Sequence, residues 1–205
     1  MGHDVIRPFE EDVLHHGGYR YAKTEQRSSL YAYKHFYDVI MGNAPLNGKR
    51  VLDVGCGSGL LSILMARKGA NVIAIDVNSD AVKIAKENAG KNRTDISGLV
   101  SDLFENVKDR FDLIVFNPPY LPLEENETKD ITYNGGLSGR EVIETFIRNV
   151  KDYLNPSGRL LLVISSLTGE KEVIGLLESA GLEASVIARQ KVPWEELVVV
   201  EAQQK

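Results

Sequence analysis

The chain has 205 residues, of which 43% are hydrophobic and 26% charged, a composition typical of a globular protein of about one domain. These proportions exclude a disordered chain, a coiled coil and a collagen. No apolar run reaches the ~18 residues of a membrane span, so we expect no membrane association, no signal peptide and a cytoplasmic location. The net charge of -5 argues against a protein that grips phosphate backbones by bulk charge.

The first part of the chain differs in composition from the rest. Residues 1–48 hold five of the eight tyrosines and all four histidines, and we predict for them a separate helical and aromatic segment, with a helix from about Ser28 to Met41. Residues 49–205 are predicted to form the main domain. The single cysteine, Cys56, permits no internal disulfide and no cysteine-based metal site, and we expect no bound metal.

From residue 50 onward, apolar runs with strand periodicity alternate with helical ones. The predicted helices are 60–67, 79–91, 139–153 and 169–180. The predicted strands are 50–54, 71–75, 97–101, 111–116, 159–164, 183–188 and 197–201, with a turn at 155–158 and a long loop at 123–136.

This alternation predicts an α/β fold of the Rossmann-like kind: a mostly parallel sheet with helices on both faces. The segment 189–196 between the last two strands is too short for a parallel crossover. These two strands should therefore form an antiparallel pair.

The first four predicted strands are each followed or ended by a polar residue, namely Asp53, Asp76, Asp102 and Asn117. In open parallel sheets, ligands bind beyond the carboxyl ends of the strands. We therefore expect these four side chains at one ligand-binding rim.

The turn after the first strand reads Asp53-Val54-Gly55-Cys56-Gly57-Ser58-Gly59. A dinucleotide fingerprint needs a sixth-position glycine, where this chain has Leu60. The spacing instead resembles motif I of S-adenosylmethionine-dependent methyltransferases, and the resemblance implies that Asp53, Gly55 and Gly57 contact the cofactor S-adenosyl-L-methionine. The alternative is a purely structural turn.

The acids that follow the next two predicted strands suit the ribose and adenine parts of such a cofactor. The carboxylate of Asp76 can accept hydrogen bonds from both hydroxyls of a ribose, or else cap the following helix. Asp102 resembles the family residue that accepts from the adenine amino group. Leu103 and Phe104 beside it form either an apolar wall for the ring or part of the core.

The motif Asn117-Pro118-Pro119-Tyr120 carries the chemistry. Its prolines stiffen the turn and keep Asn117 extended. Held rigidly, the Asn117 side-chain oxygen and the Pro118 carbonyl can accept both hydrogens of a planar NH₂ group, and Tyr120 can stack on it, with Pro119 also beside the substrate. Catalysis would then rest on positioning and electrostatics.

The motif resembles that of amino-methyltransferases, and within them the HemK-type enzymes that methylate a glutamine of translation release factors. Gly139-Arg140-Glu141 resembles a segment of the short archaeal and eukaryotic members, although it also suits a charged helix start. The resemblance implies a seven-stranded methyltransferase sheet, a release factor as protein substrate and a small zinc-binding activator protein as partner. Thr24 matches the Thr-Glu of bacterial members, which implies a cofactor contact.

Two alternatives stay open at the level of sequence. The first is an RNA or DNA amino-methyltransferase acting on adenine or guanine, with basic residues among the N-terminal tyrosines as the nucleic-acid contact. The second is a cofactor-binding subunit that has lost catalysis. The intact motif at 117–120 argues against the second.

Overall fold

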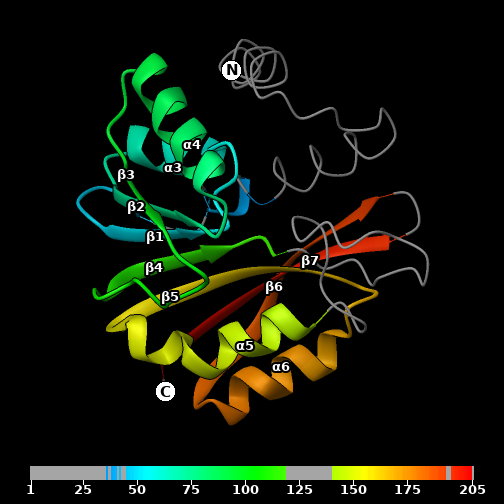
Figure 1. Cartoon of the computed structure of the whole chain (residues 1–205). Coiled ribbons are helices and arrows are strands. Elements are labelled where there is room, and N and C mark those ends of the chain that lie inside the picture. Colours follow the sequence, from blue (N-terminus) through cyan, green and yellow to red (C-terminus); the bar gives the residue numbers. More distant parts are fainter. Residues whose placement is uncertain are drawn as a thin grey trace.

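The computed structural model describes residues 36, 38–40, 42, 45–118, 140–192 and 195–204. Its seven-stranded sheet has the order β3-β2-β1-β4-β5-β7-β6 (Figure 1). The strands are β1 (Arg50–Val54), β2 (Asn71–Asp76), β3 (Ser97–Val100), β4 (Phe111–Phe116), β5 (Leu154–Ser165), β6 (Leu182–Val192) and β7 (Glu195–Gln204). The helices are α3 (Leu60–Arg67), α4 (Ser79–Lys91), α5 (Glu141–Val150) and α6 (Glu170–Ser179), with a 3₁₀ turn η1 (Lys151–Tyr153) after α5.

Strands β1 to β5 run parallel, whereas β7 is antiparallel to both β5 and β6. The predicted architecture and the predicted antiparallel C-terminal pair are thus confirmed. The chain order reverses at β1, which pairs with β2 on one side and β4 on the other. At such a switch point the loops after neighbouring strands diverge and leave room for a ligand.

Two apolar layers hold the helices against the sheet. Helices α3 and α4 cover one face, and α5 and α6 cover the other (Figure 1). The described positions 36, 38–40 and 42 are helical, and Phe36, Val39 and Ile40 are buried, all three with the α3 layer. These positions agree with the predicted N-terminal helix. No helix among the described residues is long and apolar enough to cross a bilayer.

The structure differs from the predicted elements in three places. The predicted turn at 155–158 lies inside β5: Leu154 pairs with Phe111 and Arg159 with Leu113, so four residues of β5 stand opposite one of β4 and form a bulge. Helix α5 ends at Val150 and continues as the 3₁₀ turn. Finally, β6 and β7 continue through most of the predicted connection, because residues 189–192 pair with 195–198.

Candidate functional site

The glycine-rich turn after β1 is built so that the chain can reverse tightly above the sheet. Gly55, Gly57 and Gly59 all have positive φ, at 65°, 52° and 80°, which side-chain-bearing residues rarely adopt. A Cβ on Gly59 would lie 2.8 Å from the Cβ of Ala85, so this glycine also lets α3 begin close against α4. The turn therefore needs glycine for its own backbone and for helix packing.

Asp53, in the strand before this turn, is buried and hydrogen-bonded to the helix that follows the turn. Its side chain is 2% exposed, and Ser62 Oγ in α3 donates to its Oδ2 at 2.5 Å. Burial raises the pKa of Asp53 from an ordinary value of 3.8 to about 7, with a smaller contribution from the nearby Asp76 carboxylate, while the Ser62 hydrogen bonds lower it. The predicted cofactor contact of Asp53 stays a prediction, and its structural contact is with α3.

Asp76 joins the turn to the end of β2. One carboxylate oxygen accepts from the Gly57 N–H at 3.0 Å and the other from the Asn78 N–H at 2.9 Å. Each oxygen keeps a further lone pair for another donor. Asn78 caps α4 by accepting from the Asp80 N–H. Asp76 therefore does not cap this helix, and the contact of its carboxylate with the two hydroxyls of a ribose stays a prediction.

Two apolar side chains at this rim were not singled out from the sequence. Val77, directly after Asp76, is 57% exposed, and Val100, at the end of β3, is 43% exposed. The described residues contain few large hydrophobic side chains as exposed as these. Their position beside Asp76 suits an uncharged planar ring attached to a ribose. The signal available in the sequence was an apolar residue immediately after a strand-ending acid.

Asp102 lies exposed at the rim, whereas its neighbours Leu103 and Phe104 pack partly or wholly in the core. Asp102 is exposed two residues beyond β3. Phe104 is buried and stacks on Tyr153 and Phe146, with ring centroids 4.2 and 5.1 Å away. Its side chain is therefore part of the core, and the alternative of an apolar wall for the adenine ring does not apply to it. Leu103, with φ of 45°, is half-buried against the same core. Only Asp102 and the outer side of Leu103 are available to a ligand.

The end of β4 holds the most unusual polar atom of the rim. The Oδ1 of Asn117 is buried, and no donor among the described residues reaches it. Pro118, the next residue, is buried as well. A buried amide oxygen without a partner costs roughly 1–3 kcal/mol, which makes it a strong candidate for an acceptor that a bound NH₂ group satisfies.

Asn117 stands at the same rim as the cofactor candidates. Phe116 and Ile75 both pair with Val54, so β4, β1 and β2 end side by side. The ring of Phe116 lies 3.7 Å from where a Gly55 Cβ would stand. The end of β4 and the glycine-rich turn thus lie side by side at this rim.

Three predicted site residues, Thr24, Pro119 and Tyr120, lie outside the described residues, as does the long loop 123–136. Arg140 is described: its Nη1 donates to the Thr168 carbonyl at 2.9 Å, and it forms an ion pair with Glu144 at 3.7 Å. Glu141 then begins α5. Arg140 therefore ties the start of α5 to the turn after β5, which is a structural role, while Gly139 lies outside the described residues.

Comparison with known proteins places this geometry in a family. Residues 31–192 match the Methyltransferase small domain. The chain belongs to this methyltransferase family. A Methanocaldococcus jannaschii protein, provisionally named protein N5-glutamine methyltransferase, is 48% identical over 162 residues, covering 77% of this chain and 82% of its own length. Human methyltransferase HEMK2 is 30% identical over 160 residues, covering 73% and 75%.

Solved structures agree on the fold of the methyltransferase. The E. cuniculi Mtq2-Trm112 complex, responsible for methylation of the eRF1 translation termination factor, matches with a TM-score of 0.71 and 26% identity, over 85% of this chain and 96% of that one. The T. thermophilus 16S rRNA N2 methyltransferase RsmC, in complex with AdoMet and guanosine, matches with a TM-score of 0.63 and 26% identity, over 86% and 43%. Together with the family, these neighbours imply S-adenosylmethionine as the cofactor.

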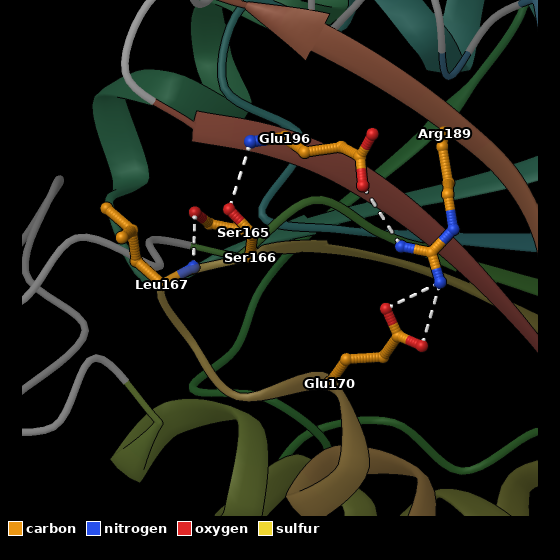
Figure 2. A network of polar contacts seen from close by, with 6 residues as sticks. All are labelled: Ser165, Ser166, Leu167, Glu170, Arg189 and Glu196. Carbon is orange, nitrogen blue, oxygen red and sulfur yellow. Dashed lines mark hydrogen bonds and ion pairs between the residues drawn. The ribbon is translucent and has the colours of Figure 1, made fainter.

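The turn after β5 is hydrogen-bonded to the start of β7. The Leu167 N–H donates to Ser165 Oγ at 3.1 Å, and the Glu196 N–H donates to Ser166 Oγ at 3.0 Å (Figure 2). Arg189 of β6 reaches both Glu196 and the first turn of α6 at Glu170. These bonds fix the outer end of the β6–β7 hairpin against the turn.

Proposed function

We propose that the protein transfers a methyl group from S-adenosyl-L-methionine to the side-chain amide nitrogen of a glutamine in a translation release factor. The observation that carries the proposal is the buried, unpartnered Oδ1 of Asn117 at the rim where the glycine-rich turn stands. The names of the relatives, which include release factor glutamine methyltransferases, support the same substrate. The proposal places the enzyme in the cytoplasm, with the translation machinery.

Different residues of the rim would bind different parts of the cofactor. Asp76 holds the ribose hydroxyls with its remaining lone pairs, Gly55 and Gly57 give the cofactor close approach to the backbone, and Asp102 with Leu103 lies at the adenine end. Asp53 keeps the turn in shape through Ser62. S-adenosyl-L-methionine supplies an electrophilic methyl group on a positively charged sulfur.

Asn117 and Pro118 would orient the acceptor. Two carbonyl oxygens that accept both amide hydrogens hold the nitrogen with its lone pair directed at the methyl carbon, and Tyr120 stacks on the amide plane. The cofactor, held by Asp76 and the glycine-rich turn, would supply the methyl group and keep the electron pair of the S–C bond, and the nitrogen held by Asn117 and Pro118 would lose one proton to water on gaining the methyl group. Positioning and electrostatics suffice for such a displacement.

The experiment is a methyl-transfer assay with labelled cofactor, offered purified release factor and total RNA side by side. Asn117→Ala should lower kcat/KM by about 100-fold or more, because it removes an interaction that acts on the acceptor. The affinity for the cofactor should change little. Asn117→Asp keeps an acceptor oxygen in place and should retain part of the activity, which separates loss of the hydrogen bond from misfolding.

A nucleic-acid amine is the second candidate, and one observation favours it: the similar RsmC structure contains guanosine as well as the cofactor. The net charge of -5 argues against it. Methyl transfer to RNA but not to release factor would establish this candidate in place of the first.

We also propose a small partner protein of the zinc-binding activator type. The Mtq2-Trm112 neighbour is a complex of this enzyme class with a second protein. In this chain β3 is a four-residue edge strand that pairs with β2 on one side only, among the described residues, and it ends in the exposed Val100. An open edge of this kind can accept a further strand.

A further inference from the structure

Two described residues other than glycine have a left-handed backbone, Arg93 with φ of 54° and Leu103 with φ of 45°. Residues that carry a Cβ rarely adopt this conformation, because the Cβ crowds the following carbonyl oxygen. Such strain persists only where the surrounding structure imposes it. Contacts outside its own backbone must therefore hold each of the two residues.

The end of a helix explains Arg93. The residue follows Asn92, the C-cap of α4, and its N–H donates to the Gly90 carbonyl at 3.0 Å. The next N–H, of Thr94, donates to the Ala89 carbonyl at 2.9 Å. These two bonds form a common left-handed ending of an α-helix, so the positive φ of Arg93 has an ordinary structural cause.

Leu103 ends no helix and lies in the connection between β3 and β4. The Glu105 N–H donates to the Asp102 carbonyl at 3.1 Å, which makes Leu103 the second residue of a β-turn. Where this position has a positive φ, glycine, asparagine or aspartate usually occupies it. The leucine found here is half-buried against the core, and its left-handed backbone needs another explanation.

The buried side chain of Ser101 bonds to both ends of this turn. Ser101 is 2% exposed, and its Oγ donates to the Leu103 carbonyl at 2.9 Å and accepts from the Asn106 N–H at 3.0 Å. A hydroxyl can donate and accept at the same time. The Asn106 side chain in turn donates to the Val100 carbonyl at 3.0 Å. Ser101 is thus the centre of the bonds that keep Leu103 left-handed.

The turn held by Ser101 lies beside Asp76. The last pair between β2 and β3 joins Asp76 and Val100, and the Ser101 N–H donates to the Asp76 carbonyl at 3.0 Å just beyond it. Asp102, the next residue, is exposed. The strained turn therefore carries Asp102 and Leu103, the two residues that the proposed function places at the adenine end of the cofactor.

We propose that Ser101 is a positioning residue, which holds the turn 102–105 in its left-handed form so that Asp102 meets the adenine amino group at a fixed place. The proposal rests on the cofactor assignment of the proposed function and adds a residue that acts through the turn. It explains why a strained leucine occurs at the rim. A turn fixed before binding loses less conformational freedom when the cofactor binds.

The first measurement is calorimetry with two cofactor analogues that have no methyl group to transfer. S-inosyl-L-homocysteine differs from S-adenosyl-L-homocysteine by a carbonyl oxygen in place of the amino group, and this oxygen cannot donate to Asp102. The unaltered protein should prefer the adenosyl compound by about tenfold or more. Ser101→Ala should bind the adenosyl compound about tenfold more weakly, and its preference should fall to about threefold or less.

Ser165 provides a matched control in the turn after β5. It is buried, and its Oγ accepts from the Leu167 N–H at 3.1 Å (Figure 2). Ser101→Ala and Ser165→Ala should each lower the melting temperature by about 2–4 °C, the effect of one lost hydrogen bond in a domain of this size. Only Ser101→Ala should change the preference between the analogues. An equal change in both variants would reflect general loosening of the protein and would overturn the proposal.

A second pair of variants tests the strain itself. Glycine adopts a positive φ without crowding, so a chain with Leu103→Gly depends less on the bonds of Ser101. Ser101→Ala should weaken the binding of S-adenosyl-L-homocysteine about tenfold in the unaltered chain, and about threefold or less in the Leu103→Gly chain. Equal losses in the two chains would show that Ser101 does not act through the backbone of Leu103.

The outcomes separate this proposal from the proposed function. If Ser101→Ala keeps both the affinity and the preference, the positioning role is refuted, and methyl transfer to the release factor is unaffected. If the unaltered protein binds neither analogue, the cofactor assignment falls, and both proposals fall with it.

Discussion

Asp53→Asn tests how the buried acid behind the glycine-rich turn affects stability. Burial raises the pKa of this carboxyl to about 7, whereas in the unfolded chain it titrates near its ordinary value of 3.8. Between these values the folded state holds a proton that the unfolded state has released. The free energy of unfolding must therefore fall as the pH rises through this window.

The magnitude follows from the width of the window. Each pH unit costs about 1.4 kcal/mol of stability, so the three units from about pH 4 to pH 7 amount to about 4 kcal/mol as an upper value. Asparagine has nearly the same shape and can still accept from Ser62, but it carries no charge at any pH. The Asp53→Asn variant should lack this part of the pH dependence.

Urea unfolding of both proteins at intervals from pH 4.5 to pH 8 measures the difference directly. The stability of Asp53→Asn relative to the unaltered protein should increase steadily with pH up to about 7 and then level off. Parallel stability curves over the whole range would show that Asp53 titrates as an exposed acid does, and would refute the account of its burial.

Two further predictions concern the same turn. Gly59→Ala should destabilise the protein by about 2 kcal/mol or more in thermal or urea unfolding, because the new methyl group would meet Ala85 at 2.8 Å at a positive φ of 80°; an unchanged stability would contradict this close packing. Asp76→Ala should weaken cofactor binding about tenfold or more, measured by calorimetry, since it removes the acceptor for the ribose and releases the Gly57 and Asn78 N–H groups; unaltered affinity would remove Asp76 from the site.

The elements between residues 50 and 116 could be predicted almost to the residue because each carries its own local signal. The strand and helix bounds of β1, α3, α4 and β4 agree with the periodicity, and Asn78 caps α4 as a side chain of its type should. The position of the three acids and Asn117 at one rim follows from these strand bounds, because the carboxyl ends of neighbouring parallel strands lie at the same edge of a sheet.

The differences arise where partners far apart in the sequence decide the structure. Asn155, Pro156 and Gly158 suggest a turn, yet Leu154 before them pairs with Phe111 and extends β5 across a bulge. The hairpin is longer than predicted because residues 189–192 gain partners on β7. Local sequence offers no sign of either pairing.

The site shows the same division between local and distant causes. The glycine turn and Asn117 could be recognised as motifs, whereas the burial of Asp53 depends on Ser62 in the next helix. The positive φ of Leu103 could not be predicted from its residue type, because leucine rarely adopts it and the bonds that hold it involve Ser101 and Asn106.

The central claim is that Asn117 presents a glutamine amide of a release factor to the methyl group. Mass spectrometry of the factor after incubation with the enzyme and cofactor tests it most directly. The account predicts one added methyl group on a glutamine side chain with the unaltered enzyme, a reduced amount with Asn117→Asp, and almost none with Asn117→Ala. An unmodified factor, or equal modification by Asn117→Ala, would contradict it.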